Sequence, residues 1–309
     1  MNRLREIRHL AGIVLRHGRR RGSAHSRRSR TIAPVSRPQD PASAVTPRDA
    51  LAPRPAPLTR ARLRVEIAIV LGLSLGTSAV YSVLSIVNRL TQQTALSQQT
   101  ATLNSPLSSR EFFDLAYQVL GVAVDLVPVV LVAFLLWREE RPHLGRLGVD
   151  FSRAGRDTLG GVGLALAIGI PGIGLYLVGK ALDLTVTVVP TNLGEHWWTV
   201  PVLLLSALRA GVTEEVIVVA YLFARLRDLG WRTWSIIVTA ALLRGSYHLY
   251  QGFGAFVGNV VMGVAFGWLY VRFGRVLPLV VAHVLMDAAV FVGYPWAATT
   301  FPTLFGLPS

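Results

Sequence analysis

Residues 211–226, GVTEEVIVVAYLFARL, decide how this chain is organised. The stretch is apolar enough to cross a bilayer, except for the adjacent carboxylates of Glu214 and Glu215. One acidic residue at the centre of a membrane helix costs about 2.5–3.5 kcal/mol even on the mildest insertion scale. A membrane helix keeps two such residues only where nearby groups neutralise them or where chemistry requires them. We therefore expect partners for both glutamates from the hydrophobic segments that follow.

The composition is that of a membrane protein. The chain has 309 residues, of which 52% are hydrophobic and 16% charged. Soluble domains carry about 25% charged residues. The sequence has no cysteine, which excludes disulfides and thiolate metal sites.

The N-terminal part is strongly basic. Residues 1–64 contain sixteen arginines and three acidic residues, and they account for most of the net charge of +14. Hydrophobic residues at helical spacing in residues 1–21 predict a short amphipathic helix on a membrane surface. Residues 22–60 lack periodicity and predict a disordered linker. We interpret residues 1–60 as a cytoplasmic tail that contacts anionic lipid rather than nucleic acid.

Residues 61–309 are predicted to form an all-α membrane helix bundle of about seven spans. The arginine content of the connections alternates, which under the positive-inside rule predicts a plasma-membrane protein with a cytoplasmic N-terminus and an external C-terminus. The basic connections are the tail and residues 138–157, 225–232 and 272–275, and the others are residues 89–111, 183–197 and 250–253. The predicted spans are residues 64–88, 112–137, 158–180, 199–224, 233–250, 254–272 and 276–294.

Polar side chains of three predicted spans lie at similar depths. At 1.5 Å per residue, Glu214 lies about 18 Å from the cytoplasmic end of its span and His248 about 21 Å. His283 lies about 10 Å deep and Asp287 about 16 Å. Because His283 and Asp287 are four residues apart, they share a helix face, as do Arg244 and His248. The spacing therefore predicts one interior cluster.

Such a cluster fits amide hydrolysis without a covalent intermediate. A carboxylate in a low-dielectric site is a strong base that takes a proton from water, while imidazoles orient the water or stabilise an oxyanion. A zinc site built from Glu214, His248 and His283 is the alternative chemistry. In a third interpretation, these groups only neutralise one another inside the bundle.

The order of these motifs resembles the CAAX-protease and bacteriocin-processing family, also called the abortive-infection family. That family carries E-E-x-x-x-R, F-x-x-x-H and H-x-x-x-N/D on successive membrane helices. Glu214 and Glu215 match the first motif, His248 the second, and His283 with Asp287 the third. The resemblance covers about residues 199–294.

The resemblance implies a membrane endopeptidase whose active site opens to the cytoplasm and acts on a membrane-associated peptide or protein. Glu214 would activate water with help from His248, and His283 with Asp287 would stabilise the oxyanion. No metal and no other cofactor is expected under this mechanism. Two further classes of function stay open: a catalytically silent scaffold or immunity-type protein, and a proton-coupled transporter.

Two positions differ from the family pattern. Val219 stands where the first motif has arginine, and Arg244 stands where the second has phenylalanine. We hypothesise that Arg244 replaces the missing arginine, pairs with Glu215, and leaves Glu214 free to act as the base.

Overall fold

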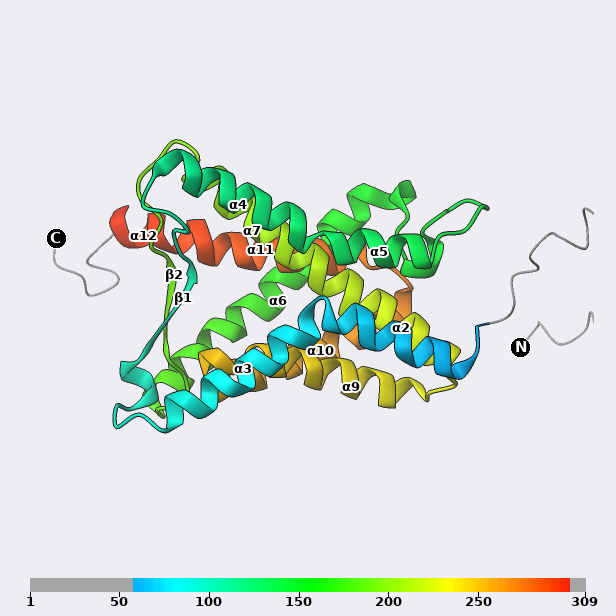
Figure 1. The fold of residues 1–309 in the computed structure, drawn as a ribbon, viewed down its shortest axis with the longest axis horizontal. Coiled ribbons are helices and arrows are strands. Elements are labelled where there is room, and N and C mark those ends of the chain that lie inside the picture. The colour runs from blue at the N-terminus through cyan, green and yellow to red at the C-terminus, as the bar shows by residue number, and fades with distance from the viewer. Residues whose placement is uncertain (1–57, 301–309) are drawn as a thin grey trace, which may run out of the picture. The chain divides into compact units, whose positions relative to one another are not determined.

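The computed structural model describes residues 58–300, which are predominantly helical (Figure 1). The predicted basic tail and its amphipathic helix lie outside the described residues, apart from residues 58–60. Contact of the tail with lipid therefore stays a prediction.

Helices overlap each of the seven segments that the sequence predicts. In chain order they are α2 (Arg60–Gly72), α3 (Leu75–Leu90), α4 (Glu111–Asp125), α5 (Val127–Leu135), α6 (Ala154–Ala181), α7 (Thr199–Glu214), the π-helix η4 (Glu215–Tyr221), α8 (Leu222–Asp228), α9 (Thr233–Tyr247), α10 (Phe253–Phe273), α11 (Leu277–Ala288), the π-helix η6 (Ala289–Gly293) and α12 (Tyr294–Thr300). Short 3₁₀ turns are η1 (Leu96–Gln98), η2 (Gly145–Leu147), η3 (Phe151–Arg153) and η5 (Leu249–Gln251).

The apolar helices show a multi-pass membrane protein. Within residues 58–300, four helical stretches are long and apolar enough to cross a bilayer: Glu111–Leu135, Phe151–Ala181, Phe253–Phe273 and Leu277–Thr300. The pair α2 and α3, bent by 57°, makes a fifth if it is one span. Two of the predicted spans are not among these stretches. The helix from α7 to α8 is interrupted by the two glutamates, and α9 has only 15 residues, which is short of the ~20 that a span needs. The count of seven spans therefore stays a prediction.

The all-helical prediction is wrong in one detail, because the connections contain a two-stranded parallel sheet. Strand β1 (Thr100–Asn104) pairs with β2 (Thr187–Thr191), with Thr100 opposite Thr187. Threonine and valine favour extended backbone, and the hydrophobic pattern that predicted the spans does not extend into these short segments. An isolated antiparallel β-bridge between Thr185 and Gly252 joins the connection before α10 to the connection that contains β2. The three arginine-poor connections therefore meet at one end of the bundle.

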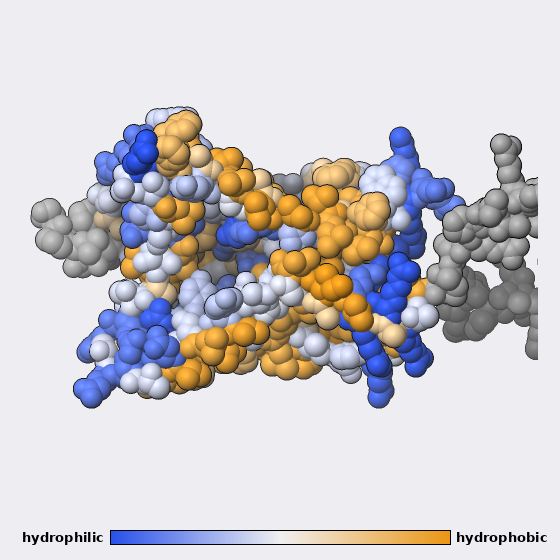
Figure 2. Space-filling view, viewed as in Figure 1, coloured by the Kyte–Doolittle hydropathy of each residue, from blue (hydrophilic) through white to orange (hydrophobic). Residues whose placement is uncertain are grey.

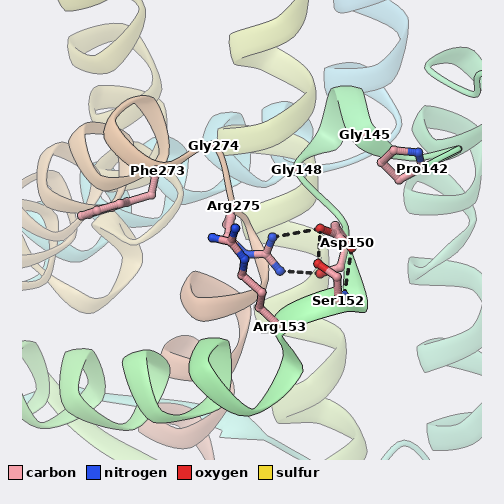
Figure 3. A pocket seen from close by; sticks show the side chains of 9 residues that line it. All are labelled: Pro142, Gly145, Gly148, Asp150, Ser152, Arg153, Phe273, Gly274 and Arg275. Atoms are coloured by element: carbon pink, nitrogen blue, oxygen red, sulfur yellow. Dashed lines mark hydrogen bonds and ion pairs between the residues drawn. The ribbon is translucent and has the colours of Figure 1, made fainter.

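The arginine-rich connections also contact one another. Arg146 pairs with Asp228 at 2.7 Å, and Arg275 binds Asp157 and Asp150, the latter at 3.1 Å. Figure 3 shows the pocket at this junction, with the Arg275 guanidinium facing Asp150. Connections of like arginine content thus lie together, as the positive-inside rule requires.

Glycines bring the site-bearing helices into close contact. A Cβ atom at Gly263 of α10 would lie 2.8 Å from the Cα atom of Ala241 on α9. A Cβ atom at Gly211 of α7 would lie 2.7 Å from Val284 of α11. Any larger residue would push these helices apart, so glycine sets the spacing at which side chains of α7, α9 and α11 meet.

Candidate active site

The six polar residues predicted to form one cluster do meet. Glu214 ends α7 and Glu215 begins η4, so both lie at the junction of the α-helix and the π-helix. The others come from two further elements: Arg244 and His248 from the C-terminal end of α9, and His283 and Asp287 from α11. Hydrogen bonds and ion pairs connect all six side chains.

Arg244 is the fully buried cation of the cluster. Its Nη1 donates to Glu215 Oε2 at 3.3 Å, and its Nη2 donates to Glu215 Oε1. The guanidinium also lies over the ring of Phe266, with its carbon 5.2 Å from the ring centroid. The predicted pairing of Arg244 with Glu215 is confirmed.

Arg244 also contacts Glu214, a contact that the hypothesis of its pairing with Glu215 did not include. Nη2 of Arg244 also donates to Glu214 Oε2, at 3.3 Å. The planar guanidinium presents several donors on one edge, so it reaches two carboxylates that are adjacent in the chain. One arginine thus compensates both buried anions.

His283 lies against this group through its Nδ1 atom. That atom is 2.7 Å from Glu215 Oε1 and 2.9 Å from Arg244 Nη2. Because a guanidinium nitrogen only donates, Nδ1 either donates to Glu215 or accepts from Arg244. The other ring nitrogen, Nε2, lies 3.6 Å from Asp287 Oδ2 and 3.9 Å from Glu214 Oε2. Both arrangements hold the His283 ring with Nε2 toward the remaining carboxylates.

His248 faces Glu214 from the end of α9. Its Nε2 lies 3.7 Å from Glu214 Oε2, which is too long for a direct hydrogen bond. Within residues 58–300, this buried nitrogen has no hydrogen-bond partner. Its Nδ1 lies 3.4 Å from the amide nitrogen of Gln251. An imidazole nitrogen is thus aimed at the carboxylate and free to bind a small polar molecule beside it.

Tyr247 belongs to the site and was missed by the sequence analysis. Its hydroxyl donates to Glu214 Oε2 at 2.8 Å, and the side chain is buried. Its ring also packs on the imidazole of His248, with the centroids 4.9 Å apart. The available signal was a tyrosine next to a motif histidine, but tyrosines are ordinary residues in membrane helices. The packing of the end of α9 against the end of α7 brings its hydroxyl to the glutamate.

The two oxygens of Glu214 have different surroundings. Oε2 accepts from Tyr247 and Arg244, and both histidines face this same oxygen. No residue of the described part of the chain donates to Oε1. The carboxylate is therefore held by one oxygen while the other keeps its lone pairs.

The π-helix η4 follows Glu214 directly. All of its residues are buried, from Glu215 to Tyr221. A π-helical turn holds one more residue than an α-helical turn and is frequent at functional sites. Val219, at the arginine position of the family motif, is 2% exposed and packs in the apolar core. The helix thus presents carboxylates at its start and hydrocarbon one turn later.

The side chains do not fit the alternative zinc set. Among the described residues, no group of three or more histidine, aspartate or glutamate side chains is arranged to hold a metal ion. The Glu214 oxygen that faces both histidines already accepts a hydrogen bond from Arg244. A cation bound there would lie against a guanidinium, and like charges repel strongly in a low-dielectric interior.

Residues 196–289 match a family model described as Rce1-like, type II CAAX prenyl endopeptidase. The match contains the whole cluster, from Glu214 to Asp287. No curated protein and no solved structure matches the chain.

Proposed function

This chain carries an Rce1-like domain of the CAAX protease family, and on that premise we propose that it is an intramembrane endopeptidase in which Glu214 activates water. The substrate is a membrane-associated peptide or protein. The observation that carries the proposal is the difference in surroundings between the two carboxylate oxygens of Glu214. Oε2 of Glu214 is held by Tyr247 and Arg244, and Oε1 is left to accept a proton.

In the first step, a water molecule hydrogen-bonded to Glu214 and to Nε2 of His248 attacks the carbonyl carbon of the substrate. Nε2 of His248 lies 3.7 Å from Oε2 of this carboxylate, so the imidazole is close enough to bind a water that lies against Oε1. The water proton passes to Glu214 as the new carbon–oxygen bond forms. Glu214 then gives that proton to the leaving amine as the carbon–nitrogen bond breaks.

The oxyanion formed in this step needs donors. His283 supplies Nε2–H in the tautomer whose Nδ1 accepts from Arg244. Asp287 lies 3.6 Å from that nitrogen, so it orients the imidazole, and it donates to the oxyanion only when it carries a proton. The roles of His283 and Asp287 are thus unequal, with the histidine as the main donor.

Arg244 and Glu215 keep the base in place. Burying two adjacent carboxylates without a counter-charge is strongly unfavourable, and Arg244 contacts both. Glu215 accepts from both Nη1 and Nη2 of Arg244 and so holds the guanidinium beside His283 and Glu214. These two residues act through the others and do not touch the reacting atoms.

We further propose the finer topology: seven spans in the plasma membrane, an active site open to the cytoplasm, and a cytoplasmic N-terminus. The arginine-rich connections contact one another at one end of the bundle. This supports a bundle whose two ends face different sides of the membrane. Under the positive-inside rule, the end that carries Arg146 and Arg275 faces the cytoplasm.

The direct test compares peptides released from membranes that contain the wild-type protein with those from membranes that contain Glu214→Gln. Glu111→Gln, at the arginine-poor end near His196 and Trp198, is the control for loss of a carboxylate elsewhere. We expect cleavage products with the wild type and the control only. Equal products from all three membranes would contradict the proposal.

The competing function is a catalytically silent membrane partner. The observation that favours it is the contact of Arg244 with Glu214 itself, because an ion cluster that is satisfied internally also serves structure alone. Glu214→Ala separates the two: it abolishes the phenotype of an enzyme, whereas a scaffold that stays folded keeps its phenotype.

A further inference from the structure

Gln251 contacts the ring nitrogen of His248 that does not face Glu214. The amide nitrogen of Gln251 lies 3.4 Å from Nδ1 of His248 and donates to the hydroxyl oxygen of Tyr250 at 2.8 Å. An amide nitrogen carries two hydrogens and only donates, so this one group has a hydrogen for each of the two atoms. In this contact, Nδ1 of His248 is therefore the acceptor.

An accepting Nδ1 determines where the ring proton of His248 lies. A neutral imidazole has one proton, and the hydrogen bond made by one ring nitrogen decides whether the other nitrogen carries it. The proton of His248 is thus on Nε2, the buried nitrogen that lies 3.7 Å from Glu214 Oε2. The site therefore has an N–H donor at this position and not a second base.

Backbone contacts hold Gln251 beside the ring. The Gln251 N–H donates to the carbonyl oxygen of His248 at 3.0 Å, which closes the 3₁₀ turn η5, and the Gln251 carbonyl accepts from the N–H of Val186 at 3.1 Å. Gly252 follows with a φ of 103°, which other residues rarely adopt. A Cβ atom at Gly252 would lie 2.5 Å from the carbonyl oxygen of Leu184. The connection that contains β2 thus fixes the residue that contacts His248.

The turn η5 is also tied to α3. The backbone N–H of Tyr250 donates to Oγ of the buried Ser82 at 2.7 Å, and η5 packs against α3. Figure 2 shows a hollow between α3 and α4 in which hydrophilic side chains gather, although the outer faces of both helices are hydrophobic. The turn therefore lies beside one wall of this hollow. Because α3 and the connection that contains β2 both hold the turn, the amide of Gln251 has a fixed position from which it can orient the neighbouring ring.

We propose that Gln251 is a positioning residue of the catalytic site, which keeps the proton of His248 on Nε2. The attacking water then accepts from Nε2–H and donates to Oε1 of Glu214, and its second lone pair attacks the carbonyl carbon of the substrate. His248 orients the water, and Glu214 alone takes its proton. The proposal rests on the proposed function for the reaction, whereas the position of the ring proton is a property of the protein without substrate.

NMR of the ring nitrogens locates the proton directly, in full-length protein with isotope-labelled histidine in lipid discs. The His248 signals are assigned by their loss in His248→Gln. We expect a protonated Nε2 and an unprotonated Nδ1 in the wild type. Gln251→Glu should place a proton on Nδ1, because a carboxylate only accepts. Gln98→Glu is the matched control and should keep the wild-type pattern, since it makes the same change at the exposed last residue of the other 3₁₀ turn at this end, η1.

Steady-state kinetics test the consequence for catalysis, with a peptide identified in the membrane comparison described above. Gln251→Glu and Gln251→Met should each lower kcat at least about 10-fold and leave KM nearly unchanged, because the water loses its orientation while the peptide still binds. Methionine keeps the length of the side chain and removes both hydrogen bonds. Gln98→Glu should keep both constants. If Gln251 only stabilises the turn η5, its variants lower Tm but change neither the ring proton nor kcat, and that result would overturn the proposal.

A proton on Nδ1 in the wild type would mean that the amide oxygen of Gln251 faces the ring, and it would overturn the proposal. This measurement needs no Gln251 variant, so it decides even where those variants do not fold. In a wild-type protein that cleaves peptides, this result refutes the role of Gln251 alone. A protein that carries the proton on Nε2 and hydrolyses nothing would instead refute the proposed function and, with it, the catalytic role of Gln251.

Discussion

The hydroxyl of Tyr247 donates a hydrogen bond to Oε2 of Glu214 at 2.8 Å, and both side chains are buried. The bond fixes one carboxylate oxygen and so determines where the other one lies. A carboxylate with a single firm anchor at Arg244 would rotate about its last side-chain bonds. Catalytic bases have to be held in the productive geometry, and displacements of about 1 Å cost about 100-fold in rate.

Tyr247→Phe should therefore lower kcat by about 10- to 100-fold and leave KM nearly unchanged. The phenyl ring keeps the packing on His248, so the loss isolates the hydrogen bond. Steady-state kinetics in lipid discs give both constants. Tyr270→Phe, a buried tyrosine whose hydroxyl lies 3.4 Å from the backbone oxygen of Arg146, is the control and should keep full activity. A fall confined to KM would contradict a positioning role.

Glu214→Gln should leave the protein folded and inserted while hydrolysis falls by several orders of magnitude. An amide of equal volume keeps the contact with Tyr247, since its oxygen still accepts, but it cannot take a proton from water. Glu66→Gln is the control and should keep activity, because it changes a carboxylate that binds Arg225 and Tyr221 outside the catalytic cluster. Activity retained in purified Glu214→Gln protein would rule out the glutamate mechanism.

The sequence predicted the site better than it predicted the connections. Glutamates and histidines in apolar segments are costly, so their burial together follows from energetics, and rise per residue places them at one level. The strands β1 and β2 could not be found this way, because five-residue segments in polar connections carry no membrane signal.

The finer contacts depend on geometry that no sequence pattern encodes. The π-helix η4 shifts the direction of the side chains after Glu214, and no residue in GVTEEVIVVAY marks its start. The contacts of Tyr247 and Arg244 with Glu214 depend on how the end of α9 packs against the end of α7, which is a tertiary contact. The bond of Arg209 to Asp125 joins residues that are 84 apart in the chain, so no local pattern predicts it.

Metal removal is a separate test of the mechanism. If Glu214 and His248 alone activate water, thorough chelation should leave kcat and KM unchanged, and elemental analysis should find well below one zinc per chain. Readdition of zinc to the chelated protein controls for damage by the chelator. Stoichiometric zinc that is lost together with activity in His248→Ala would favour the metalloprotease mechanism instead.

The pairing of Arg244 with Glu215 predicts that the two departures from the family pattern compensate each other. Arg244→Phe restores the family residue but strands two buried carboxylates, a change that typically costs about 3–5 kcal/mol. The single variant should therefore lose activity and stability. Val219 lies four residues after Glu215 in a π-helix, about one turn away, so an arginine there reaches the same carboxylate from its own helix.

Val219→Arg alone should destabilise the protein, because it buries a second cation beside Arg244 in an apolar core where Val219 is 2% exposed. Combined with Arg244→Phe, it should recover much of the lost stability and activity, since the double variant contains one arginine for the same two glutamates. A double-mutant cycle on thermal stability and on kcat in lipid discs measures the coupling. Additive effects within error would show that positions 219 and 244 share no partner, and the compensation hypothesis would then be wrong.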